Sequence, residues 1–225
     1  MHLHWEGAPD GIEASVELEI VEPPSVARLY FWALQVGFRS SSGPGKGGGA
    51  HLGLQWNPRH RGSTAVNWGG YDRAGHILDG TTSPVPSSVD DPNTRTWTWQ
   101  SGRPYRLRVF PGSRSGWWWG EVTDLATGRA TRVRELAGGG DRLSGFVVWS
   151  EVFAACDDPS VVARWNRPGV LTKEGRRAPT GWRVNYQDYA RGGCTNTCSQ
   201  SDDTAGVVQI TNTSRRVFQG ELIPN

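Results

Sequence analysis

The sequence predicts an all-β chain, a two-sheet antiparallel β-sandwich of the jelly-roll (concanavalin-like) type. Glycine accounts for 30 and proline for 14 of the 225 residues, and both recur between short runs. Those runs are rich in β-branched and aromatic residues, and almost none has helical periodicity. Ten or more short strands without helices favour a sandwich over a small barrel. The length suits a single domain spanning residues 1–225, in which the cysteine-bearing loop belongs to the C-terminal part, 156–225.

The first strands are predicted from their apolar patterns. In "IEASVELEI" (12–20) apolar residues alternate with glutamate and serine, which predicts an outer strand with one buried face and one solvent-exposed face. In "RLYFWALQVGF" (28–38) both faces are apolar, which predicts a central strand covered on each side. A flexible glycine-rich loop (39–49) leads to "AHLGLQW" (50–56), so we expect these two strands to form a hairpin.

The later strands are bounded by turn residues. A helical turn capped by Asp157 or Asp158 is expected at the start of "DDPSVVARW" (157–165). The remaining candidate strands are 63–68, 94–100, 105–110, 117–124, 143–153, 181–187 and 206–212.

Three consecutive tryptophans, Trp117 to Trp119, begin one of these strands. We pair it with 105–110 so that Phe110 faces Trp117, which puts Trp118 on a core face with Val109 and Leu107. A shift by one residue would bury the Glu121 carboxylate without a partner, at a cost in free energy. The opposite face then carries Arg106, Arg108, Phe110, Trp117, Trp119 and Glu121.

This amphipathic face predicts a ligand site. Aromatic rings can stack on the apolar faces of sugar rings, and guanidinium and carboxylate groups can hydrogen-bond their hydroxyls. Plain packing is the alternative for each tryptophan, since the residue is favoured in strands. The predicted ligand-binding residues are Trp117, Trp119, Arg108, Arg106, Glu121, Trp97, Trp99 and Gln55.

An acid–base pair is the basis of an alternative function. His51 lies beside Gln55 on a polar face, and Glu151 shares a face with Trp149. Glycoside hydrolysis needs two carboxylates in one cleft, and this strand supplies only one. An enzyme would therefore use His51 and Glu151 in a cleft on the tryptophan-bearing face, acting on a glycan or as a cyclase or isomerase of a hydrophobic small molecule. A third possibility is a protein-interaction scaffold that uses the aromatic patch.

The three cysteines cannot all be paired. Cys194 and Cys198 could close a small disulfide loop, or either could pair with Cys156; a lone C-x3-C is a weak zinc signal. No cofactor is otherwise predicted, although calcium is possible at the loop aspartate doublets. These are Asp90 with Asp91, Asp157 with Asp158, and Asp202 with Asp203.

The charge pattern limits the partners. The formal net charge is +2 and the arginines are scattered, so nucleic acid is not expected as a partner. No run approaches the roughly 18 apolar residues of a membrane helix. The first residues, "MHLHWEGAPD", lack the features of a signal peptide, so either a cytoplasmic location or export with an already removed leader fits. A glycan or small molecule is the expected ligand, and the oligomeric state is open.

Three segments resemble the bacterial domain-of-unknown-function group 3472. They are "GGGAHLGLQWN" (47–57), "GRPYRLRV" (102–109) and "WWWGEVTDLATG" (117–128), and the similarity extends over about residues 28–155. The resemblance implies a concanavalin-like or jelly-roll sandwich associated with extracellular carbohydrate biology. It implies no catalytic residues, and it leaves the N-terminal strand and the cysteine-bearing tail unexplained.

Overall fold

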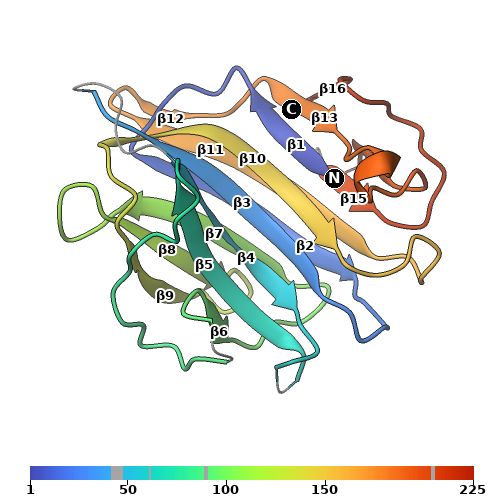
Figure 1. Ribbon diagram of the computed structural model, residues 1–225. Helices are drawn as coiled ribbons and strands as arrows, with labels where there is room; N and C mark the ends of the chain where they lie inside the picture. Colours follow the sequence, from blue (N-terminus) through green and yellow to red (C-terminus); the bar gives the residue numbers. More distant parts are fainter. Residues whose placement is uncertain (42–47, 61, 89–90, 204–205) are drawn as a thin grey trace.

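Two large antiparallel β-sheets stack face to face in a sandwich, as predicted (Figure 1). The computed structural model describes residues 1–41, 48–60, 62–88, 91–203 and 206–225. Within these ranges the one helical segment is a 3-10 turn, η1 (Tyr189–Arg191). Sheet A has the order β16-β13-β1-β10-β3-β4-β5-β6, and sheet B the order β14-β15-β11-β2-β7-β8-β9, with β12 paired to β11.

Both sheets combine strands from distant parts of the chain. The strands of sheet A are β1 (His2–Glu6), β3 (Tyr30–Arg39), β4 (Gly48–Trp56), β5 (Thr64–Asp72), β6 (Thr94–Thr96), β10 (Arg142–Val152), β13 (Gly181–Asn185) and β16 (Leu222–Pro224). Those of sheet B are β2 (Glu13–Glu22), β7 (Pro104–Pro111), β8 (Trp118–Asp124), β9 (Arg129–Leu136), β11 (Val162–Thr172), β12 (Gly175–Arg177), β14 (Cys198–Ser201) and β15 (Val207–Ile210).

One core fills the space between the sheets and draws residues from Leu3 to Ile223. Four of its largest fully buried side chains are tryptophans: Trp32, Trp68, Trp165 and Trp182. The packing is close where β8 crosses Trp68, because a Cβ atom on Gly120 would lie 2.6 Å from the indole ring. A glycine is therefore needed at that point of the tryptophan-rich strand.

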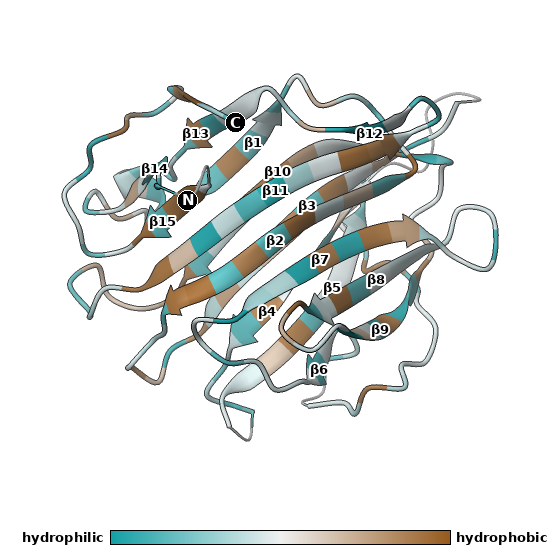
Figure 2. Cartoon of the chain, turned by 180° about the vertical axis from the view of Figure 1, so that it is seen from behind, coloured by the Kyte–Doolittle hydropathy of each residue, from teal (hydrophilic) through white to brown (hydrophobic). Residues whose placement is uncertain are grey.

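The alternating segment 12–20 forms most of β2, but it does not lie at an edge. β2 is flanked by β11 and β7, and Figure 2 shows bands of teal and brown alternating along β2 and β7. The expectation of an outer strand is therefore wrong in position, although the division into an apolar and a polar face is right. The polar face is compatible with a central position because arginines of the neighbouring strands pair with its glutamates.

The apolar segment 28–38 forms β3, a central strand between β10 and β4. Its hairpin with β4 is confirmed, with Tyr30 opposite Trp56 and Gly37 opposite Gly49. Of the expected loop between them, residues 42–47 lie outside the described part of the chain. The helical turn expected in 157–165 is wrong, since 156–158 form a turn and a bend, 159–161 have no regular structure and residues from Val162 onward are extended in β11.

The β7–β8 hairpin has the predicted faces but another register. Phe110 lies opposite Trp119, not Trp117, and Arg108 lies opposite Glu121. The Gly112 N–H donates to the Trp117 carbonyl at 2.7 Å, which puts Trp117 in the turn and lets β8 begin at Trp118. A shift of two residues keeps each side chain on its own face, so Trp118 still points into the core.

Candidate functional site

The predicted site residues lie in three separate places. Arg106, Arg108, Trp119 and Glu121 are on the outward face of sheet B, with Trp117 in the adjoining turn. His51, Gln55 and Glu151 are on sheet A. Trp97 and Trp99 pack at the core. Since the first two sets lie on opposite sides of the sandwich, an enzyme using His51 and Glu151 cannot have its cleft on the tryptophan-bearing face; that expectation is wrong.

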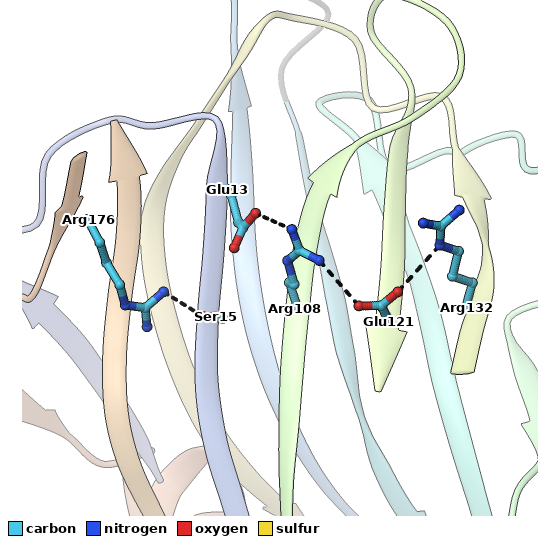
Figure 3. A network of polar contacts seen from close by, with 6 residues as sticks. All are labelled: Glu13, Ser15, Arg108, Glu121, Arg132 and Arg176. Atoms are coloured by element: carbon cyan, nitrogen blue, oxygen red, sulfur yellow. Dashed lines mark hydrogen bonds and ion pairs between the residues drawn. The ribbon is translucent and has the colours of Figure 1, made fainter. Parts of the chain in front are cut away.

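The outward face of sheet B, which we call the arginine face, is a chain of ion pairs (Figure 3). Arg108 Nη2 lies 2.6 Å from Glu13 Oε2, and Arg108 Nη1 lies 3.4 Å from Glu121 Oε1. Arg132 Nε continues the chain, 3.4 Å from Glu121 Oε2. The hydrogen bond to Glu13 raises the pKa of Arg108 above its ordinary value. The polar groups predicted to meet a sugar therefore already bind one another.

The aromatic rings near this face are covered in a similar way. The guanidinium carbon of Arg114 lies 3.7 Å from the centre of the Trp117 ring, and that of Arg108 lies 4.3 Å from Phe110. Arg132 lies 5.5 Å from the half-buried Trp119 ring. These are cation–π contacts. A hollow of about 510 Å³ does lie on the arginine face, but charged side chains, serine and threonine line it, and none of the described residues that line it is aromatic.

Trp99 is part of the core and Trp97 packs against it. Trp99 is 4% exposed, and its indole N–H donates to the Gln55 carbonyl at 3.0 Å. Trp97 is half-buried, packs edge-on against Tyr105 at 5.4 Å and donates to Thr131. Both have packing roles here, and the structure does not bring them together with the arginine face.

A larger cavity lies on the outward face of sheet A and has a volume of about 600 Å³. Its floor is formed by alternate residues of β3, β4 and β10, since side chains two apart on a strand share a face. In the ladder Glu151 lies opposite Phe31, and Gln35 lies opposite His51. The walls come from the β10–β11 connection (153–156) and the segment 186–197.

The floor of the cavity is a cluster of rings. Phe31 contacts Trp149 edge-on with centroids 4.8 Å apart, and it contacts His51 at 5.5 Å. The Trp149 indole N–H donates to Gln35 Oε1 at 3.2 Å, which fixes the amide and leaves its NH₂ group as a donor. Tyr71 and Phe153 also line the cavity and are 49% and 57% exposed. The cavity thus combines a fixed aromatic floor with two accessible rings.

His51 and Glu151 line this one cavity, and burial shifts both pKa values. Burial lowers the pKa of His51 to about 4, although the negative charge of Asp91 acts in the opposite direction. Burial raises the pKa of Glu151 above its ordinary value. The two residues stand on β4 and β10, separated by β3 and hence by about 10 Å or more. Direct proton transfer between them would require hydrogen-bond contact, so they are not a dyad.

The sequence reasoning missed Phe31, Gln35, Tyr71 and Phe153, and it named Trp149 only as a neighbour of Glu151. One available signal was Gln35, a polar residue within an otherwise apolar strand. Gln55, which was predicted as a ligand contact, is buried and accepts a hydrogen bond from Asn57 at 3.3 Å. It does not line the cavity.

The cysteines settle one open alternative. Cys156 and Cys194 form a disulfide between the two walls of the cavity, and Cys198 is free and buried.

No group of three or more His, Cys, Asp or Glu residues suited to a metal ion occurs within the described ranges. Asp90 of the calcium candidates lies outside them, while Asp158 accepts a hydrogen bond from Ala155 and Asp202 pairs with Arg164. Among the described residues, no helix is long and apolar enough to cross a membrane.

The similarity to solved structures is distant. No protein-family model matches the chain, and no curated protein is similar to it in sequence. Scytalido-glutamic peptidase with a peptide-based transition state analog shares 11% identity over 94% of this chain and 97% of its own, with a TM-score of 0.48. The eqolisin-family peptidase SCP-B, in a complex with a tripeptide, has 11% sequence identity over 94% of this chain and 96% of its own, with a TM-score of 0.46. The enzymatically active domain of tailspike protein 2 from bacteriophage CBA120 has 17% sequence identity over 76% of this chain and 24% of its own, with a TM-score of 0.37. We draw no function from similarities at this level.

Proposed function

We propose that this chain is a carbohydrate-binding β-sandwich whose ligand occupies the cavity on sheet A. The observation that carries the proposal is the composition of that cavity. Accessible rings stand beside the Gln35 amide and the Glu151 carboxylate in a hollow of about 600 Å³. Small-molecule sites have volumes of about 300–1,000 Å³ and combine apolar walls with a few polar groups.

The length of the cavity suits an oligosaccharide. Tyr71 on β5 and Phe153 just beyond β10 stand at opposite ends, about 14 Å apart across the sheet and about 26 Å apart along the strands, because Tyr71 is in the row of Gly37 and Phe153 in that of Leu29. Rings in these positions can stack on sugar units near the two ends of the ligand, while Gln35 and Glu151 between them hydrogen-bond the hydroxyls. The resemblance to group 3472, which implies extracellular carbohydrate biology, is a prediction in the same direction.

A glycan array followed by calorimetric titration of the best ligand tests the proposal. Tyr71→Ala and Phe153→Ala should each weaken binding about 5- to 30-fold, the effect of losing 1–2 kcal/mol of ring contact. Trp119→Ala is the matched control, because it removes a half-buried ring from the arginine face. Loss of binding in Trp119→Ala alone would move the site to sheet B, and a parent protein that binds no glycan would refute the function.

An enzyme acting at the same cavity is the second candidate. It is favoured by the two ionisable groups, His51 and Glu151, whose pKa values are both shifted by burial, as is common in active sites. Glu151 would donate or accept the proton, and the neutral His51 would orient the substrate. In this case Glu151→Gln abolishes turnover of the bound glycan and largely preserves its binding. A parent protein that leaves its ligand unchanged excludes the enzyme.

A further inference from the structure

The cavity on sheet A differs from the rest of the surface in its charge. The chain contains 24 lysines and arginines, yet none is among the described residues that line this cavity. Glu151 is the one acidic side chain among them. Five other glutamates, Glu6, Glu13, Glu17, Glu19 and Glu121, each pair with an arginine. No such ion pair joins Glu151 to an arginine or lysine of the described ranges.

The other titratable groups facing the cavity do not offset this charge at neutral pH. Burial lowers the pKa values of His2 and His51 to about 4, so both imidazoles are neutral. The Met1 amino group donates to the Ser150 carbonyl at 3.0 Å and, when protonated, attracts the Glu151 carboxylate. Burial lowers the pKa of this amino group to about 6, so it is mostly uncharged at pH 7. The Arg215 guanidinium, which contacts cavity-lining residues, lies 3.8 Å from the centre of the Tyr186 ring and donates to the Cys194 and Thr197 carbonyls.

A carboxylate that no arginine or lysine of the described residues pairs with, set among aromatic rings, is an arrangement that favours cations. Glu151 lies between Trp149 and Phe153 along the outward row of β10, opposite Phe31. Ring faces attract ammonium groups, and a charged hydrogen bond to a carboxylate is stronger than a neutral one. We propose, resting on the carbohydrate site above, that the preferred ligands carry a positive charge, as amino sugars with a free ammonium group do, and that Glu151 binds that group.

Three trisaccharides of equal length test this proposal at pH 6.5. A glucosamine trimer carries ammonium groups, whereas N-acetylglucosamine and glucose trimers are neutral. We expect the glucosamine trimer to bind the parent protein at least ~10-fold more tightly than either neutral trimer. Glu151→Gln should remove this preference, because the affinity for the glucosamine trimer falls more than the affinity for the neutral trimers, which lose only a charged hydrogen bond to a hydroxyl group. Glu121→Gln on the arginine face is the matched control and should retain the preference.

Two results would overturn the inference: no preference for the charged trimer in the parent, or a preference that persists in Glu151→Gln. Neutral trimers that bind without any preference for charge would leave the carbohydrate proposal standing alone. If no trimer binds, cyclohexylamine and cyclohexanol provide a second test without a sugar. Binding of the amine alone, lost in Glu151→Gln, would support the charge preference and refute the carbohydrate function. Binding of neither would refute both proposals.

Discussion

Removal of the Cys156–Cys194 disulfide should affect both stability and ligand binding, because the bond joins the two walls of the cavity. The cysteines are 38 residues apart in sequence. In the chain-entropy model, a loop of this length contributes about 4 kcal/mol to the free energy of unfolding. Without the bond, the hydrogen bond of 2.6 Å from Asn196 Nδ2 to the Cys156 carbonyl is one remaining link between the walls, and it is exposed to competing water.

Urea unfolding of Cys194→Ser measures the first effect and titration with the cavity ligand measures the second. We expect the free energy of unfolding to fall by about 4 kcal/mol. We also expect the affinity to fall in conditions where the variant is still folded, because no covalent bond then joins the segment 186–197 to the opposite wall of the cavity. Chemical reduction of the parent protein should reproduce both changes.

Cys198→Ser is the control for this experiment. Cys198 is a buried free thiol in β14, so its replacement affects stability but not the connection between the walls. Its ligand affinity should equal that of the parent. A Cys194→Ser variant that binds the ligand as well as the parent would refute the claim that the disulfide positions the walls. A loss of stability below ~1 kcal/mol would refute the entropic estimate.

Two further predictions concern buried side chains. The free energy of unfolding should decrease as the pH falls from 6.5 to about 4, because the unfolded chain binds protons at His2 and His51 that the folded chain still excludes. In urea titrations, His51→Gln should make the free energy of unfolding depend less steeply on pH. An unchanged pH dependence in this variant would contradict the prediction. Trp118→Ala should cost about 3–5 kcal/mol, since Trp118 is 2% exposed. Trp119→Ala should cost clearly less, and equal losses in urea unfolding would contradict the assigned faces.

Local patterns were sufficient to predict which residues face the core. The alternation in 12–20 and in the β7–β8 hairpin assigned Val16, Leu107 and Trp118 to the interior, where all three are buried. A register error of two residues leaves each side chain on the same face of the sheet, so the prediction of which residues are buried is confirmed although Phe110 pairs with Trp119. The strand β9 was missed because its sequence, RATRVREL, buries two charged residues, Arg134 and Glu135, beside the apolar ones.

The position of each strand within a sheet could not be predicted in the same way. β2 meets β7 across more than 80 residues of sequence, and only this pairing puts Glu17 beside Arg106 and Glu13 beside Arg108. The walls of the cavity on sheet A likewise come from the segments 153–156 and 186–197. Contacts between such distant segments leave no periodic signal in the chain.

Strand order also decides which outward face can accept a ligand. On sheet B, β7 with its arginines lies between β2 and β8 with their glutamates, so the charges are satisfied across the ladders. On sheet A, β10 lies between β1 and β3, and neither neighbour brings an arginine or lysine beside Glu151. The three consecutive tryptophans therefore indicate a tightly packed hairpin. The less conspicuous row of Trp149, Glu151 and Phe153 retains a carboxylate that no described arginine or lysine pairs with, and an exposed ring with which a ligand can interact.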